Sequence, residues 1–128
     1  MAKPSGLRYS IAAMGRTIYH MCRRDEWQAA ERAGAYAGSS QDRADGFIHF
    51  SDASQVQESA ARHRAGQAGL VLLAVDEGRL GPSLRWEPSR RGQLFPHLYG
   101  SLPLSAVIAV HDLPLGADGT HLFPPLSD

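Results

Sequence analysis

The chain has 128 residues, which fits one domain that buries roughly two-thirds of its unfolded surface, and 43% hydrophobic with 20% charged residues is typical of a globular protein. Thirteen basic residues balance thirteen acidic ones, and this zero net charge argues against a nucleic acid as the main partner. Because the single Cys22 excludes an internal disulfide and no apolar run approaches the ~20 residues of a membrane span, we expect a cytoplasmic protein without a membrane partner.

The first predicted element follows an extension over residues 1–15, which we expect to lie outside the fold. Residues 16–21 are rich in β-branched and aromatic side chains, and this composition predicts a strand. Residues 25–34 have helical spacing of apolar side chains, two acids in the first turn and a glycine at the end, and so predict a helix. Residues 35–46 are dense in Gly, Ser, Asp and Gln and predict a loop.

A second strand and a second helix come next. Residues 47–50 predict the strand. Asp52 and Gln55 have the spacing of a capping box, in which each side chain bonds the backbone of the other, and a helix is expected from there to about Ala65. Residues 70–76 are an apolar run of strand length, which predicts a central strand buried on both faces.

Strands dominate the remainder of the chain. They are predicted at residues 84–87, 95–100 and 106–113. Two early helices beside a strand-rich second half predict an α+β fold, and not a doubly wound parallel sheet. We expect one domain over residues 16–113. The Pro- and Gly-rich residues 114–128 then predict a tail that is poorly ordered or draped over the surface.

Two histidines occupy the middle of predicted strands. Burying His20 and His49 without a function costs desolvation free energy that leucine would avoid. Each strand also ends in a small group able to hydrogen-bond, Cys22 in the first and Ser51 in the second. If the strands are neighbours, both rings project toward a common cleft, and we predict that they belong to a functional site. The histidines at positions 63, 111 and 121 are expected to lie outside it.

Three further candidates lie in the second half of the chain. Glu87 follows Trp86 and has arginines nearby, so it either forms a structural ion pair or acts as an acid that stabilises a developing cation. His97 and Tyr99 are two residues apart and share one face of a strand. They either line one pocket or form a packing motif at a turn.

Metal and thiol chemistry have weaker support. The chain has no HxH, HxxxH or HExxH motif, so no metal is expected. A metal held by residues from distant strands stays an alternative. A second alternative is a nucleophilic thiol at Cys22, which would need a nearby base to lower its pKa.

The segments "TIYHMC", "RADGFIHFS", "GLVLLAVD" and "FPHLYGSLPLSAV" follow one another in the chain. In this order they closely resemble a family of small bacterial proteins, domain of unknown function 952, over residues 17–110. A more distant resemblance is to the catalytic domain of RNA 2′-phosphotransferases, which have the ADP-ribosyltransferase fold. The matching positions are Tyr19-His20, Arg43, His49-Phe50-Ser51, Arg62-His63, Val71-Leu72 and Leu102-Pro103-Leu104.

The distant resemblance implies two small curved sheets around a cleft, with NAD as the bound nucleotide. When the residue roles of the superfamily are transferred to this chain, Tyr19 and His20 lie at the ribose, and His20 anchors it. The backbone of Met21 and Cys22 then holds the nicotinamide amide, although the glycine that the superfamily has after its histidine is here Met21. Arg43 becomes a phosphate ligand.

The resemblance also implies roles in the second half of the site. His49 and Ser51 line the nicotinamide or phosphate side. Glu87, His97 and Tyr99 compete for the residue that stabilises the oxocarbenium-like transition state. We therefore predict an NAD-binding enzyme that transfers or hydrolyses ADP-ribose. The alternatives are a non-catalytic nucleotide- or metabolite-binding module and a metal-dependent hydrolase, and the oligomeric state stays open.

Overall fold

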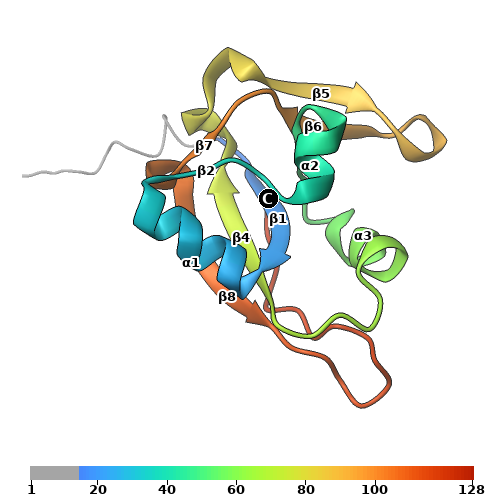
Figure 1. The fold of residues 1–128 in the computed structure, drawn as a ribbon. Coiled ribbons are helices and arrows are strands. Elements are labelled where there is room, and N and C mark those ends of the chain that lie inside the picture. The colour runs from blue at the N-terminus through green and yellow to red at the C-terminus, as the bar shows by residue number, and fades with distance from the viewer. Residues whose placement is uncertain (1–14) are drawn as a thin grey trace, which may run out of the picture.

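The computed structural model describes residues 15–128 and arranges their strands in three antiparallel sheets (Figure 1). In the largest sheet, β4 (Leu70–Asp76) lies between β1 (Thr17–Arg23) and β8 (Val107–Leu113). All residues of β4 are buried, which confirms the central strand predicted from its continuous apolar run. The α+β fold class is confirmed as well.

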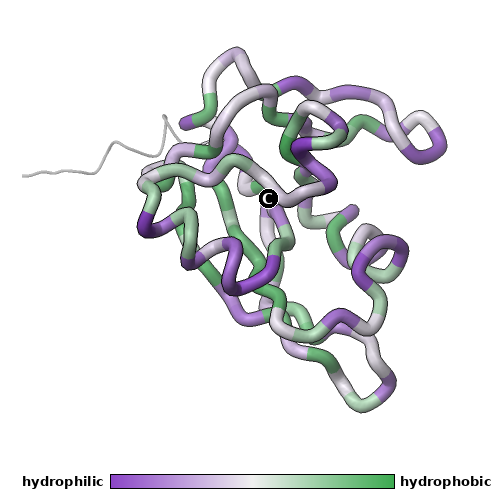
Figure 2. Tube along the Cα trace, in the orientation of Figure 1, coloured by the Kyte–Doolittle hydropathy of each residue, from purple (hydrophilic) through white to green (hydrophobic). Residues whose placement is uncertain are grey.

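Hydrophobic cores lie on both faces of this sheet because successive side chains of a strand point to opposite sides. On one face, Ile18 and Cys22 of β1 pack with Trp27 and Ala30 of α1 (Arg24–Ala33). Helix α1 ends at Gly34, whose positive φ of 91° suits a residue without a side chain. Figure 2 shows hydrophobic residues along most of β4, whereas hydrophilic residues recur along α1.

The second three-stranded sheet has the order β3 (Ile48–His49), β6 (Leu94–Leu98), β5 (Leu84–Pro88). It is linked to the first sheet by one backbone bridge between Tyr19 and Ser51, with N–H···O distances of 2.8 and 2.9 Å. The bridge brings the two predicted histidine strands side by side.

The prediction of a loop over residues 35–46 is wrong. This segment contains β2 (Ala35–Tyr36), which pairs with β7 (Leu102–Pro103), and the short helix α2 (Ser40–Asp45). Ser39 caps α2, since its hydroxyl accepts the Asp42 N–H and its own N–H donates to the Asp42 carboxylate. Ser, Asp and Gly, which indicated a loop, are also the residues that begin and end short helices. Residues 15–128 therefore have three helices and three sheets, where two of each were expected.

Helix α3 (Val56–His63) is shorter than predicted at both ends. The capping box forms only in part: the Asp52 N–H donates to Gln55 Oε1 at 3.0 Å, but the Asp52 carboxylate accepts from Ser54 instead of the third helical residue. The capped segment is thus a turn that precedes the helix.

The C-terminal segment, residues 114–128, is draped against the second core. Phe123 and Leu126 pack on the cluster that contains Tyr19. The Tyr19 hydroxyl donates to the Ser127 carbonyl at 2.8 Å, and His121 is buried. The extension predicted over residues 1–15 falls outside the described residues except for Gly15, whose N–H donates to Asp76. Within the described part of the chain, no helix has the length and apolar character needed to cross a membrane.

Candidate functional site

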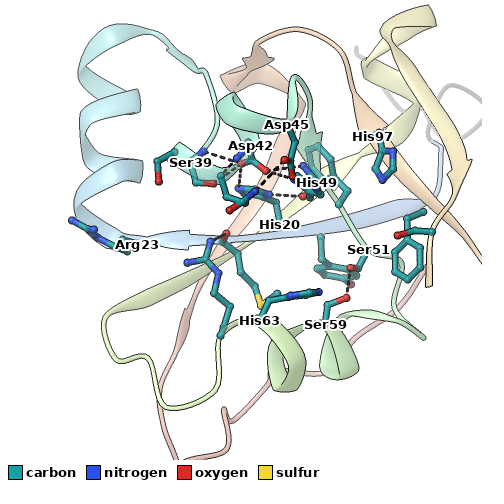
Figure 3. Close-up of a pocket in the computed structure, with 18 of the residues that line it drawn as sticks. His20, Arg23, Ser39, Asp42, Asp45, His49, Ser51, Ser59, His63 and His97 are labelled. Carbon is teal, nitrogen blue, oxygen red and sulfur yellow. Dashed lines mark hydrogen bonds and ion pairs between the residues drawn. The ribbon is translucent and has the colours of Figure 1, made fainter. Parts of the chain in front are cut away.

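A pocket of about 860 Å³ lies where the two three-stranded sheets meet. Its walls come from β1, α1, α2, β3, α3, β6 and the 3-10 turn Arg90–Gly92. Figure 3 shows Asp42, Asp45, His20 and His49 gathered on one side of the pocket and His63 with Ser59 on the other. Seven elements from distant parts of the chain thus contribute side chains to one cavity, whose volume suits a small-molecule ligand.

Asp42 is the buried anion of the site. Its Oδ1 accepts from the His49 N–H at 3.0 Å and from His49 Nδ1 at 2.5 Å, and its Oδ2 accepts from the N–H and hydroxyl of Ser39 at 2.8 and 3.0 Å. Burial alone would raise the pKa of Asp42, but these hydrogen bonds outweigh it and hold the pKa well below its usual range. Asp42 is therefore ionised, and all of its strong contacts are with the protein.

His20 is fixed in one tautomer by its neighbours. Its Nδ1 lies 2.6 Å from the His49 carbonyl, which can only accept, so Nδ1 carries the proton. Burial lowers the pKa of His20, which leaves the ring neutral, and Nε2 accepts from the Tyr36 hydroxyl at 2.8 Å. Asp42 Oδ2 is 3.6 Å from Nε2, beyond hydrogen-bond distance. Both nitrogens of His20 are thus occupied by protein groups.

His49 lies between two carboxylates at the pocket surface. Nδ1 contacts Asp42, and Nε2 is 3.0 Å from Asp45 Oδ2. A ring with a proton on each nitrogen satisfies both contacts. The side chain of His49 is 41% exposed and that of Asp45 39%, so this pair can meet a ligand, whereas Asp42 is only 3% exposed.

His97 lies directly opposite His49 in the β3–β6 pairing, with ring centroids 5.8 Å apart. Its Nδ1 is 2.7 Å from Glu87 Oε1, which also accepts from the Tyr99 hydroxyl at 2.7 Å. The hydrogen bonds from Tyr99 and His97 lower the pKa of Glu87. Phe47 stacks on the His97 ring at 4.0 Å. Among residues 15–128, Nε2 of His97 has no hydrogen-bond partner, and the ring lines the pocket.

The opposite wall is basic. The Arg90 guanidinium donates from Nη2 to Ser59 Oγ at 3.1 Å, and Ser59 Oγ is 3.0 Å from Ser51 Oγ. His63 Nε2 is 3.3 Å from Arg90 Nη1. Burial and the Arg90 charge lower the pKa of His63. The pocket therefore places the Asp45–His49 pair and the Arg90 guanidinium on different walls.

The segments that form the pocket also identify the family. Residues 21–110 match the family model described as "Protein of unknown function (DUF952)". The chain belongs to this DUF952 family. Its resemblance to that family, inferred from the succession of strand motifs, is thereby confirmed.

Solved structures of protein CC0527 from Caulobacter crescentus are similar to this DUF952 chain. The X-ray structure is 51% identical, covers 83% of this chain and 93% of its own, and superposes with a TM-score of 0.80. The solution NMR structure is 52% identical, covers 80% and 89% of the two chains, and gives a TM-score of 0.73. No match was found among the curated proteins.

The DUF952 pocket contains most of the residues predicted from sequence but not all of them. The predicted residues that line it are Tyr19, His20, Met21, His49, Ser51 and His97. Those that lie outside it are Cys22, Arg43, Glu87 and Tyr99. Of the three candidates in the second half, only the His97 ring reaches the cavity, while Glu87 and Tyr99 support it from behind.

Two of the residues outside the pocket have other contacts. Arg43 is exposed, and its Nη1 donates to the Gly38 carbonyl at 2.8 Å. Cys22 is buried in the core, and burial raises the pKa of its thiol to about 12. The thiol is therefore protonated at neutral pH, which removes the condition for a nucleophilic Cys22. Among residues 15–128, no group of three or more His, Cys, Asp or Glu side chains is placed to hold a metal ion.

Sequence reasoning missed Asp42, Asp45, Arg64 and Arg90, and it was wrong to expect His63 outside the site, because this side chain lines the pocket. A signal for Asp42 was present, because Ser39 and Asp42 have the spacing of a capping box. Arg64 and Arg90 gave no such signal, since an arginine near a helix end or in a turn is usually a solvated residue.

Proposed function

We propose that this DUF952 protein binds a nucleotide of the NAD type in the pocket and cleaves or transfers ADP-ribose. The observation that carries the proposal is the separation of charge across one cavity: Asp45 and His49 on one wall, and Arg90 on the other. NAD has a cationic nicotinamide ring at one end and a diphosphate further along, so its charges are complementary to the two walls. A pocket of about 860 Å³ lies within the usual range for such ligands.

The resemblance to the ADP-ribosyltransferase superfamily supports the same proposed function. It implies two small sheets around a cleft, and here two three-stranded sheets meet at the Tyr19–Ser51 bridge beside the pocket. In the proposed complex, the bond from ribose C1′ to the nicotinamide nitrogen breaks and both electrons pass to the pyridinium ring. Positive charge then develops on the ribose, where an oriented carboxylate is most effective. Asp45 is the candidate, because the oxygens of Asp42 are engaged by Ser39 and His49.

His97 is the candidate general base of this reaction. In the tautomer whose Nδ1–H donates to the Glu87 carboxylate, Nε2 is an acceptor, and the ring lines the pocket. Nε2 takes the proton of the attacking water or alcohol as its oxygen bonds to C1′. His20 has a different role from the one that the resemblance implies. With both nitrogens bonded to Tyr36 and His49, it positions β3 beside β1 and does not bind a ribose hydroxyl.

Calorimetry with NAD, ADP-ribose and nicotinamide, paired with an assay for nicotinamide release, tests the proposal. We expect NAD to bind and nicotinamide to be released. His97→Gln should retain binding within a few-fold and lower the release rate about 100-fold or more, the usual contribution of a general base. His111→Gln, on β8 away from the pocket, is the matched control and should release nicotinamide at the wild-type rate. No binding of any of the three ligands would contradict the proposal.

A second candidate is a nucleotide-binding module without catalysis. The engagement of Asp42 and His20 with protein groups favours it, since neither is free to change partners during a reaction. Binding of NAD or ADP-ribose without nicotinamide release would identify this function.

A further inference from the structure

Arg90 extends into the pocket with part of its guanidinium unused. Nη2 donates to Ser59 Oγ, and the guanidinium carbon lies 4.8 Å from the centre of the Phe95 ring. Nε is buried and has no hydrogen-bond partner among the described residues. A ligand cannot reach the covered Nε, but the contacts of Nη1 with His63 and of Nη2 with Ser59 leave N–H groups of the guanidinium for an acceptor that a ligand would supply.

No carboxylate of the described residues fills that role. Glu58 is near, but its Oε2 accepts from Arg62 at 2.9 Å and from Arg91 at 2.9 Å, and it does not line the pocket. Asp42 and Asp45 lie on the opposite wall beside His49 (Figure 3). The guanidinium of Arg90 therefore faces the cavity without an anionic partner there.

Another donor lies on the same wall. The Ser59 hydroxyl, which is buried, bonds both Arg90 and the Ser51 hydroxyl. The partly used Arg90 guanidinium and this hydroxyl present several donors to one group in the cavity, which is the chemistry that a phosphate group requires.

We propose that Arg90 and Ser59 form a phosphate subsite, which takes a phosphate monoester or diphosphate group of the ligand. This inference deepens the proposed function, on which it rests for the identity of the whole ligand. It sets the direction in which the ligand lies: phosphates at the α3 wall, and the reacting ribose at Asp45 and His97. The subsite recognises the phosphate group itself, so a free pyrophosphate should occupy it.

An NMR titration with inorganic pyrophosphate, at low ionic strength and without nucleotide, tests the subsite directly. The Nε–Hε signal of Arg90 should shift in a saturable way as the guanidinium gains an anionic partner. Arg90→Gln should weaken pyrophosphate binding at least tenfold. Arg91→Gln, one residue along, is the matched control: Arg91 is 69% exposed and pairs with Glu58 outside the pocket, so binding should change less than twofold.

Ser59→Ala provides a second variant in case Arg90→Gln does not fold, and it should weaken pyrophosphate binding severalfold. The absence of a saturable shift, or equal losses in Arg90→Gln and Arg91→Gln, would overturn the subsite. The phosphate subsite and the proposed function can be tested separately. Arg90-dependent binding of pyrophosphate without binding of NAD or ADP-ribose supports the subsite and removes the NAD proposal. Equal binding of NAD by wild type and Arg90→Gln removes the subsite alone.

Discussion

Asp42 is the residue on which the polar contacts of the acidic wall converge. It bonds the backbone and side chain of Ser39 and of His49, so it joins the start of α2 to β3. The His49 carbonyl in turn fixes His20 on β1. One buried carboxylate therefore sets the relative positions of both histidines that the strand pattern singled out.

Asp42→Asn should lower the free energy of unfolding by about 3 kcal/mol near neutral pH, because an amide cannot replace a buried carboxylate among charge-assisted donors. The folded-state pKa of Asp42 lies below its ordinary value of 3.8. Its stabilisation is thus fully present above that value and is lost as the pH falls toward the folded pKa. Urea unfolding at about pH 7, 5 and 3 should give a constant difference between the two proteins above pH ~5 and a smaller one near pH 3.

Asp45→Asn is the control for this prediction. Asp45 is 39% exposed, and its contact with His49 should contribute no more than ~1 kcal/mol. A difference for Asp42→Asn that grows below pH ~4 would contradict the direction of the pKa shift.

The residues of the site differ in how far the sequence could predict them. His20, His49 and His97 were predicted because a histidine in an apolar strand pattern is conspicuous, and all three line the pocket. Asp42 was missed because an aspartate in a polar segment resembles any solvated residue. Its burial arises from tertiary packing beneath β3, and the local sequence has no periodicity that indicates this burial.

At the scale of elements, α2 is the part of the fold that the site depends on most. It has six residues, too few to be stable alone, and it is held by its caps and by the Asp42 contacts. Gly46 ends it with a positive φ of 88° and turns the chain directly into β3. The geometry of the acidic wall thus depends on the Ser39 cap.

Ser39→Ala should lower the free energy of unfolding by about 1–2 kcal/mol, because it removes the cap and one donor to Asp42. The same change should weaken ligand binding, since Asp42 and Asp45 both lie on α2. Ser40→Ala alters the neighbouring exposed position and should stay within ~0.5 kcal/mol of wild type. Chemical unfolding of the three proteins measures the effect; equal stability of Ser39→Ala and Ser40→Ala would rule out the capping role.

The long elements followed from the sequence, whereas most of the short ones did not. The buried run of β4 and the amphipathic pattern of α1 each extend over enough residues to show their period. β2, α2 and β7 have two to six residues, and their structure depends on partners far along the chain. β2 becomes a strand only because β7 pairs with it.

At the scale of the whole molecule, the C-terminal segment completes the second core. Phe123 and Leu126 cover the face of the sheet opposite α1, and the Ser127 backbone both accepts from and donates to the Tyr19 hydroxyl. A Pro- and Gly-rich composition indicated a surface segment correctly, but it gave no sign of these specific contacts.

Phe123→Ala should therefore lower the free energy of unfolding by about 1–3 kcal/mol, the range for a partly buried aromatic ring. Leu122→Ala is the matched control, because Leu122 is 56% exposed and its removal should change stability by no more than ~0.5 kcal/mol. Urea denaturation of the two variants measures the difference. Equal stabilities would mean that the segment does not contribute to the core.

Because β1 has a core on each face, the position of His20 depends on the register of that strand. Inserting or deleting one residue before His20 would turn the strand over, sending the imidazole toward Phe123 and the Tyr19 ring toward Trp27. Natural variation in length that preserves this pocket should consequently be confined to connections such as residues 77–83, where an added residue leaves the alternation of the strands intact.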